Sequence, residues 1–239
     1  MIRRGLAILL LCSAGALAAP PADSDDATEL ISWLLEDGRN LEGIPFSRVI
    51  EASSGRQVIP VNPDSDRVRI ETLSGAIGAA IDALNMPANP IHEAGRINEA
   101  SRHVEDAMRA AINQIPNWSC GIPKTAVGAE QRSGYPDLRI VCDDGRIIYL
   151  DPKLFNAGSR ASSLRTFYFE PKTKTGKVND DAIHLLVGVQ HNGKRGKDLR
   201  LERWELVDLS KLDVQLKAEF QASNKGLYRE NAVVGRSAE

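Results

Sequence analysis

The chain has 239 residues, of which 42% are hydrophobic and 26% are charged, and its formal net charge is −2. These proportions are typical of a folded globular protein and exclude a largely disordered chain. The length favours one domain, or one domain with an N-terminal elaboration. No internal run approaches the ~20 apolar residues that a membrane span needs. The near-neutral overall charge does not by itself mark a nucleic-acid-binding protein.

Residues 1–18 have the pattern of a secretory signal peptide. Arg3 and Arg4 form a short basic region, an apolar stretch runs from Leu6 to Cys12, and Ala16-Leu17-Ala18 is a cleavage site of small residues. We therefore expect cleavage before Ala19, export to the periplasm or the medium, and no membrane span in the mature protein. An uncleaved membrane anchor is the alternative, although the apolar stretch is short for a span.

Two cysteines remain in the mature chain, Cys120 and Cys142, because Cys12 leaves with the signal peptide. A pair of cysteines in an oxidising compartment is consistent with a disulfide bond, which would contribute about 3 kcal/mol by closing a short loop. Two free buried thiols are an equal alternative. Two cysteines without a suitable pair of histidines do not predict a zinc site.

Residues 19–88 are expected to form an N-terminal α+β elaboration. Apolar spacing predicts a helix over 28–36, two strands over 47–52 and 57–61, and a helix over 72–84. The segment from Asn85 to Pro90 contains two prolines and two asparagines, and it is the clearest break in the chain. We place the boundary of the elaboration at this break.

Residues 89–228 are expected to form the core domain, and residues 229–239 a loose tail. Asn89 can cap, and Pro90 can open, a helix that runs to about Ile115. Five strands and one helix are predicted after it: strands over 138–142, 146–150, 164–170, 183–190 and 199–207, and a helix over 209–220. Asp143-Asp144-Gly145 between the first two strands is a strong hairpin signal.

Two acidic residues flank this predicted hairpin. Asp137 follows Tyr135-Pro136 at the start of the first strand, and Asp151-Pro152-Lys153 stands at the end of the second. Because side chains two residues apart point to the same face of a strand, Asp151 and Lys153 should lie side by side. Two carboxylates can hold a hard divalent cation such as Mg²⁺, with Mn²⁺ as the alternative, and leave places for water and phosphate.

This spacing resembles the PD-(D/E)xK motif of the restriction-endonuclease-like nuclease superfamily, and the resemblance covers about residues 90–210. It implies an α/β fold with a restriction-endonuclease-like core, in which a helix precedes a mixed β-sheet with flanking helices. It also implies that Asp137, Asp151 and the backbone carbonyl of Pro152 bind a divalent cation. Lys153 would then be the catalytic ammonium group.

Pro152 departs from an ordinary strand pattern, because proline cannot donate a hydrogen bond to a sheet ladder. We expect the strand either to end or to bulge at this residue. A competing interpretation makes Asp137 a turn residue and Asp151-Pro152 a strand terminator, with no catalytic role for either.

Many members of that superfamily add a glutamate from the preceding helix. With Val104 at the zero of a helical wheel, the apolar face centres at about 20° and Glu105 lies at about 100°, at the edge of that face. We therefore predict Glu105 as the additional acid, with Glu93 as the rival. His184 is expected to be a hydrogen-bonded core residue, with a substrate role as the alternative. His103 is expected on the helix surface or in the cleft.

Basic residues gather in the segment 153–203, which holds 11 Lys and Arg against 5 Asp and Glu. Two loops in this segment are predicted to grip DNA phosphates: Lys172, Lys174 and Lys177 in one, and Lys194, Arg195 and Lys197 in the other. The alternative is that both are ordinary solvated loops.

The sequence therefore predicts an exported, metal-dependent nuclease that hydrolyses DNA phosphodiester bonds. The alternative is a non-catalytic binding or structural module of the cell envelope on a nuclease-like fold. Because an exported nuclease meets no methylated host genome, a true restriction enzyme is not expected. The oligomeric state is left open by the sequence.

Overall fold

The computed structural model describes residues 28–32, 42–162, 167–217 and 221–235, so the predicted signal peptide over 1–18 lies outside the described residues. The chain divides into two compact units, one of Glu42–Leu216 and one of Met1–Leu41 with Lys217–Glu239. The second unit contains a helical turn over 28–32 and the short helix α5 (Asn224–Leu227). In the described part of the chain, no helix has the length and apolar character that crossing a membrane requires.

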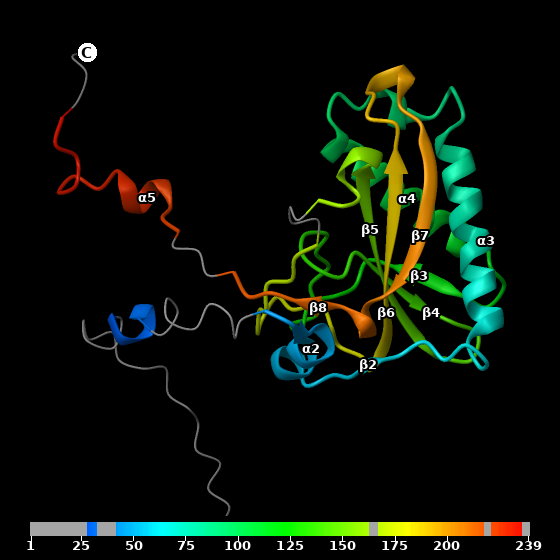
Figure 1. Ribbon diagram of the computed structural model, residues 1–239, viewed down its shortest axis with the longest axis horizontal. Helices are drawn as coiled ribbons and strands as arrows, with labels where there is room; N and C mark the ends of the chain where they lie inside the picture. Colours follow the sequence, from blue (N-terminus) through cyan, green and yellow to red (C-terminus); the bar gives the residue numbers. More distant parts are fainter. Residues whose placement is uncertain (1–27, 33–41, 163–166, 218–220, 236–239) are drawn as a thin grey trace, which may run out of the picture. The chain divides into compact units, whose positions relative to one another are not determined.

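A mixed, six-stranded sheet forms the centre of the unit Glu42–Leu216 (Figure 1). Its strands are β2 (Val58–Ile59), β3 (Ser119–Gly121), β4 (Leu138–Val141), β5 (Ile147–Asn156), β6 (Ala182–His191) and β7 (Leu201–Asp208). The order is β2-β6-β5-β4-β3, and β7 pairs with β6 in addition. β2 pairs with the first two residues of β6, and β7 pairs with its later part, from Leu185 to His191. β6 runs parallel to β2 and β5, while the other pairs are antiparallel. A separate antiparallel pair joins β1 (Ile44–Pro45) to β8 (Asp213–Val214).

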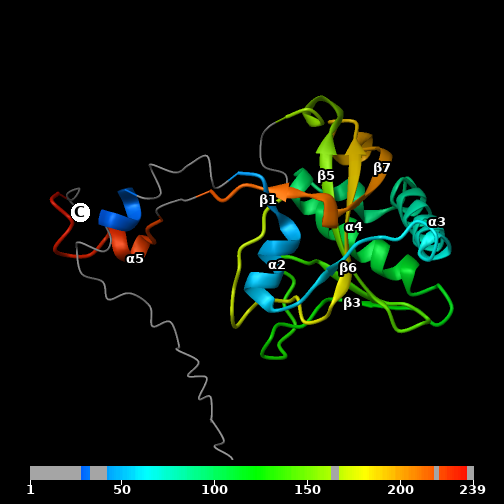
Figure 2. The same ribbon diagram turned by 60° about the horizontal axis from the view of Figure 1, so that its bottom comes forward.

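Helices cover both faces of this sheet. They are α2 (Phe46–Ser54), α3 (Arg67–Leu84) and α4 (Ile97–Ile112), and four short 3-10 turns accompany them: η1 (Pro90–Glu93), η2 (Ala157–Ser159), η3 (Gly196–Asp198) and η4 (Leu209–Lys211). Figures 1 and 2 show α2 and α3 on opposite sides of β6. α3 and α4 share one large apolar core with the sheet, and α2 closes a smaller core on the other face.

α4 forms because apolar residues recur once per turn along it. Ala100, Val104, Met108 and Ile112 are four residues apart and at most 1% exposed, so they form one buried stripe against the sheet. The predicted helix from Pro90 is divided in the structure. Pro90 opens only the turn η1, and α4 begins after Gly95, where the Glu99 carboxylate accepts hydrogen bonds from the backbone N–H groups of Gly95 and Arg96.

The strand predicted over 47–52 is wrong, since these residues belong to α2. Phe46 and Ile50 lie one helical turn apart and both are fully buried, so the apolar spacing is that of a helix. Gly55, with φ +67°, ends the helix in the left-handed conformation that glycine adopts without strain. The following strand is confirmed as the short β2.

The helix predicted over 209–220 is also wrong in its described part. The turn η4 occupies Leu209–Lys211, and β8 follows at Asp213–Val214. The Asp208 carboxylate caps η4 by accepting from the N–H of Ser210, and the Leu212 carbonyl accepts from the N–H of Phe46. These contacts hold the chain extended beside α2.

Four predicted strands are confirmed as β4, β5, β6 and β7. The strand predicted over 164–170 is not found in its described part, and residues 163–166 lie outside the described residues. Cys120 and Cys142 are both free and buried. Their burial raises the thiol pKa to about 12 for Cys120 and to about 11 for Cys142.

Candidate active site

Asp137, Asp151 and Lys153 meet where β4 and β5 lie side by side. Leu138 pairs with Leu150 in this antiparallel ladder, so one further step places Asp137 opposite Asp151. The Nζ atom of Lys153 is 3.1 Å from Oδ2 of Asp137 and 2.5 Å from Oδ2 of Asp151. The structure therefore brings together the three residues that the sequence motif singled out, and one ammonium group is shared by two carboxylates.

Strand alternation decides which face of the sheet carries this group. Ile148 and Leu150 of β5 belong to the large core with α3 and α4, whereas Tyr149 belongs to the smaller core with α2. Asp151 and Lys153 follow Tyr149 at intervals of two residues and share its face. The carboxylates and the ammonium group thus lie on the α2 side of the sheet, at the point where β4 begins.

Asp151 is the most deeply buried acid of the site, at 1% exposure. Burial and the nearby Asp137 carboxylate raise the pKa of Asp151 to about 7, and the Lys153 ammonium acts in the opposite direction. Burial alone would lower the pKa of Lys153, but Asp151 and Asp137 outweigh it and raise that pKa. The lysine therefore stays charged and partly balances two acids that repel one another.

Pro152 lies inside β5, opposite Val187 of β6, and the strand continues to Asn156. The interpretation of Asp151-Pro152 as a strand terminator is therefore wrong, as is the expectation that the strand ends here. The β4 ladder stops at Leu150, so within the described part of the chain β5 has no ladder partner on that side at Pro152. A missing N–H group is tolerated at such an edge.

Glu105 of α4 is the third acid near this group. Burial and the Asp137 carboxylate, in that order, raise the pKa of Glu105. Arg132 lies 3.7 Å from Glu105 and donates a hydrogen bond of 2.8 Å to Asp106. The rival acid Glu93 is exposed on η1 and is not part of α4. Arg132 was not singled out by the sequence, because it stands in a loop without periodic signal.

Lys177 lies inside the protein, at 1% exposure, rather than on the exposed loop predicted for it. Its Nζ atom donates to the backbone carbonyls of Gln131 at 3.2 Å and Arg132 at 3.3 Å. Burial lowers the pKa of Lys177, while the carboxylates of Asp137 and Asp151 act against this effect. Lys177 is thus an interior cation beside the acidic group, and sequence spacing contains no signal for its burial.

The other predicted DNA contacts remain on the surface. Lys172 and Lys174 are exposed after the aromatic segment 167–169, and Lys194, Arg195 and Lys197 are exposed on the connection from β6 to β7. Their ammonium and guanidinium groups are therefore available to solvent or to a phosphate backbone.

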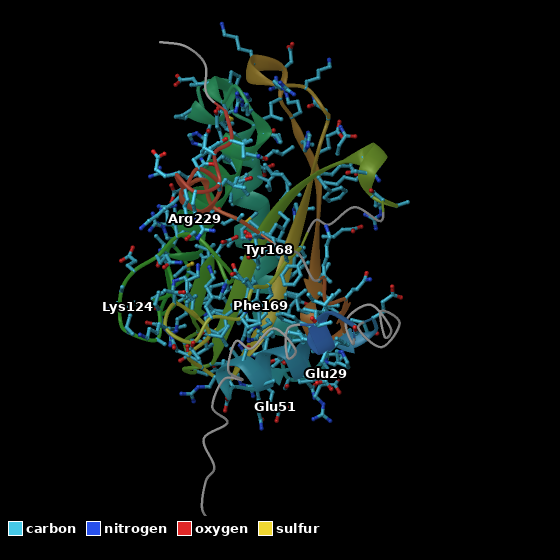
Figure 3. All side chains as sticks on the ribbon, turned by 90° about the vertical axis from the view of Figure 1, so that its left-hand side faces the viewer. Glu29, Glu51, Lys124, Tyr168, Phe169 and Arg229 are labelled. Atoms are coloured by element: carbon cyan, nitrogen blue, oxygen red, sulfur yellow. The ribbon has the colours of Figure 1, made fainter. Side chains whose placement is uncertain are left out.

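His184 is a core residue on the α2 side of the sheet. Its Nδ1 atom shares a hydrogen bond of 2.6 Å with the hydroxyl of Tyr135, and burial lowers its pKa to about 4. Phe46 and Phe169 pack edge-on against Tyr135, with centroids 5.5 and 5.8 Å away, and Figure 3 labels Phe169 beside the exposed Tyr168. These rings support the segment that leads into Asp137. His103, on α4, is half-buried.

The oxygen atoms of this site suit a hard divalent cation. Asp137 and Asp151 offer two carboxylates, and the Pro152 carbonyl lies 3.3 Å from the Lys153 ammonium group between them. Among the described residues no group of three His, Cys, Asp or Glu side chains is placed to hold a metal. Mg²⁺ needs only one or two protein carboxylates when water and phosphate complete its shell, so the donors present fit this cation.

Comparisons with known proteins assign the chain to a family. The model of the Type II restriction enzyme MjaV family matches residues 39–231. The chain is 32% identical to the Type II restriction enzyme MjaV of Methanocaldococcus jannaschii over 220 residues, which is 86% of this chain and 94% of that relative. No solved structure matches it significantly. The chain therefore belongs to the Type II restriction enzyme MjaV family.

Proposed function

We propose that this protein is a divalent-metal-dependent endonuclease that hydrolyses DNA phosphodiester bonds at a PD-(D/E)xK site. The observation that carries the proposal is the convergence of Asp137 and Asp151 on the ammonium group of Lys153, 3.1 and 2.5 Å away, across β4 and β5. The order of α4 before a mixed sheet supports a restriction-endonuclease-like core. The relative, a Type II restriction enzyme by name, supports DNA as the substrate.

Asp137, Asp151 and the Pro152 carbonyl would hold Mg²⁺, or Mn²⁺ in its place. When bound, the cation polarises the scissile phosphate and lowers the pKa of the attacking water. Lys153 contributes its own charge. Its ammonium group, 26% exposed on the side chain, can donate to a non-bridging phosphate oxygen and stabilise the negative charge that develops there.

Glu105 contributes a carboxylate from α4. Because burial and Asp137 raise its pKa, this carboxylate is a stronger base than that of an exposed glutamate. It can orient water beside the phosphate, while Arg132 holds it through the 3.7 Å ion pair. The exposed loops with Lys172 and Lys174, and with Lys194, Arg195 and Lys197, would bind phosphates along the duplex without selecting sequence.

Cleavage of supercoiled plasmid tests this function directly. The full chain is incubated with Mg²⁺, with Mn²⁺ and with EDTA, and the variants Asp137→Asn and Lys153→Ala are measured in parallel. Lys124→Ala is the matched control, since Lys124 is an exposed lysine that belongs to none of the proposed catalytic or DNA-binding residues (Figure 3). We expect cleavage to require the metal and to fall about 100-fold or more in Asp137→Asn and Lys153→Ala, because each removes charge stabilisation of several kcal/mol.

Full activity in EDTA, or in Lys153→Ala, would contradict the site assignment. Intact plasmid with folded protein in both metals would instead favour the non-catalytic alternative, a binding or structural module on a nuclease-like fold.

A further inference from the structure

A cavity of about 220 Å³ lies on the same face of the sheet as Lys153 and has no role in the chemistry described so far. It is lined by Phe155, Arg160, Gln190, Arg203, Trp204 and Glu205. These residues come from β5, β6 and β7 and from the segment that follows η2. Most of the lining side chains are polar, and they include hydrogen-bond donors of both arginine and amide type as well as one carboxylate.

The strand register ties this cavity to Lys153. Lys153 pairs with Gly188 of β6, and Gly188 pairs with Glu205 of β7, so these three residues form one row across the sheet. The next row on the same face is formed by Phe155, Gln190 and Arg203. The two rows are about 7 Å apart, the rise of two residues along a strand. The polar lining therefore begins in the row of the catalytic lysine.

Gly188 leaves space above β6 for the ring of Phe155. A Cβ atom at this position would be 3.3 Å from the ring of Phe155, a closer approach than side chains usually make. Glycine thus lets the Phe155 ring lie over the strand. The Phe155 ring therefore covers this part of β6 and forms the apolar part of the cavity lining, beside the polar side chains of Gln190 and Arg203.

Polar side chains of the cavity are hydrogen-bonded and remain accessible to solvent. Arg160 donates to Glu205 at 2.7 Å, and the two side chains are 59% and 52% exposed. Gln190 donates to Glu202 at 2.9 Å. The Arg160 and Arg203 guanidinium groups lower the pKa of Glu205, so its carboxylate is an acceptor at neutral pH. Each of these solvent-exposed contacts can be exchanged for a contact with a ligand at small cost.

We propose that this cavity, which we name the β5–β7 pocket, contacts base edges of the DNA duplex whose phosphodiester bond is cleaved at the site containing Lys153. Arg203 and Gln190 act as specificity-determining residues. Arginine and glutamine are the side chains that bind guanine and adenine edges through two hydrogen bonds, and glutamate accepts from cytosine. A cavity of about 220 Å³ is smaller than a typical small-molecule site and fits one base edge with its water. This inference rests on the proposed function.

Sequence preference is the measurement that tests the β5–β7 pocket. Wild-type protein with Mg²⁺ first selects its preferred site from a pool of randomised duplexes. The kcat/KM ratio is then measured on that site and on each single base-pair change, for wild type, Arg203→Ala, Gln190→Ala and the control Arg67→Ala. Arg67 is an exposed residue of α3, which packs on the opposite face of the sheet.

We expect Arg203→Ala and Gln190→Ala each to lower kcat/KM on the preferred site roughly 5- to 150-fold and to lose discrimination at one base pair. Arg67→Ala should keep both. A uniform loss over all duplexes would show a phosphate contact only and overturn the inference, as would unchanged preference in both variants or a wild type that cleaves without preference. Absence of any cleavage by wild type would instead refute the proposed nuclease function itself.

Discussion

At the scale of single residues, the site is defined by an acid that is costly to bury. Asp151 is 1% exposed and stands beside a second carboxylate, Asp137, with one shared ammonium group between them. A buried charge is tolerated only when it is paired or coordinates a metal. Lys153 lies directly between the two acids, and in the function proposed above a divalent cation would add further positive charge beside them.

The variant Asp151→Asn tests the effect of this buried carboxyl group on stability separately from its effect on cleavage. The pKa of Asp151 is raised to about 7 in the folded protein, above its value in the unfolded chain, so any stabilisation at low pH is lost as pH rises through 7. In EDTA, we take the melting temperature of Asp151→Asn minus that of wild type at each pH. We expect this difference to be roughly 2–4 °C larger at pH 8 than at pH 6, because only the wild type has a carboxyl group that ionises there. Cleavage should be abolished in the same variant.

Thermal unfolding in EDTA at both pH values makes this measurement, and added Mg²⁺ should stabilise wild type more than Asp151→Asn. An equal difference in melting temperature at pH 6 and pH 8 would argue against an ionising carboxyl group at this position.

At the scale of elements, the loop before β4 is positioned from inside the protein. Lys177 donates to the carbonyls of Gln131 and Arg132, and Arg132 in turn faces Glu105 and Asp106 of α4. The segment carrying Lys177 is itself fixed, because the N–H of Asn179 donates to the Tyr149 hydroxyl. A chain of contacts thus leads from β5, through Lys177, to the acid on α4.

Lys177→Met tests this arrangement. Methionine keeps much of the buried volume but leaves two carbonyl groups without their donor, so we expect a loss of about 1–3 kcal/mol in the free energy of unfolding. Chemical denaturation measures it. Lys172→Met is the matched control, because Lys172 is exposed on the same segment and its change should stay within about 0.5 kcal/mol. Equal stability of the two variants would show that Lys177 does not anchor the loop.

At the scale of the whole molecule, the family match begins at residue 39, so the leader at residues 1–18 lies outside it. We propose that this leader is a cleaved signal peptide and that the protein is exported. The basic residues Arg3 and Arg4, the apolar stretch and the small-residue cleavage site support the proposal.

Intact mass of the protein from fractionated cells checks the export proposal. We expect the periplasmic fraction or the medium to contain a chain that begins at Ala19. A full-length chain retained in the cytoplasm would refute it, and it would place the proposed nuclease in the compartment that holds the genome.

Sequence reasoning found the acidic pair and its lysine because their signal is local. Asp137 and Asp151 are separated by one hairpin, Asp143-Asp144-Gly145, and Asp151 and Lys153 are related by the two-residue period of a strand. The helical period likewise identified α4 and the edge position of Glu105. The same approach failed at 47–52, where a short apolar run fits either a strand or a helix, and at 209–220, where tertiary contacts hold the chain extended.

By itself, then, the sequence determined the strand–turn–strand unit, the helix before it, and the spacing of two carboxylates and one ammonium group. Only the tertiary structure decided that Pro152 stays within β5, that Lys177 lies inside, that Arg132 faces Glu105, and that Gln190 and Arg203 share a face with Lys153. The physical reason is the range of the interactions. Periodicity and turn chemistry act between near neighbours, whereas burial and strand register depend on segments that meet only when the chain has folded.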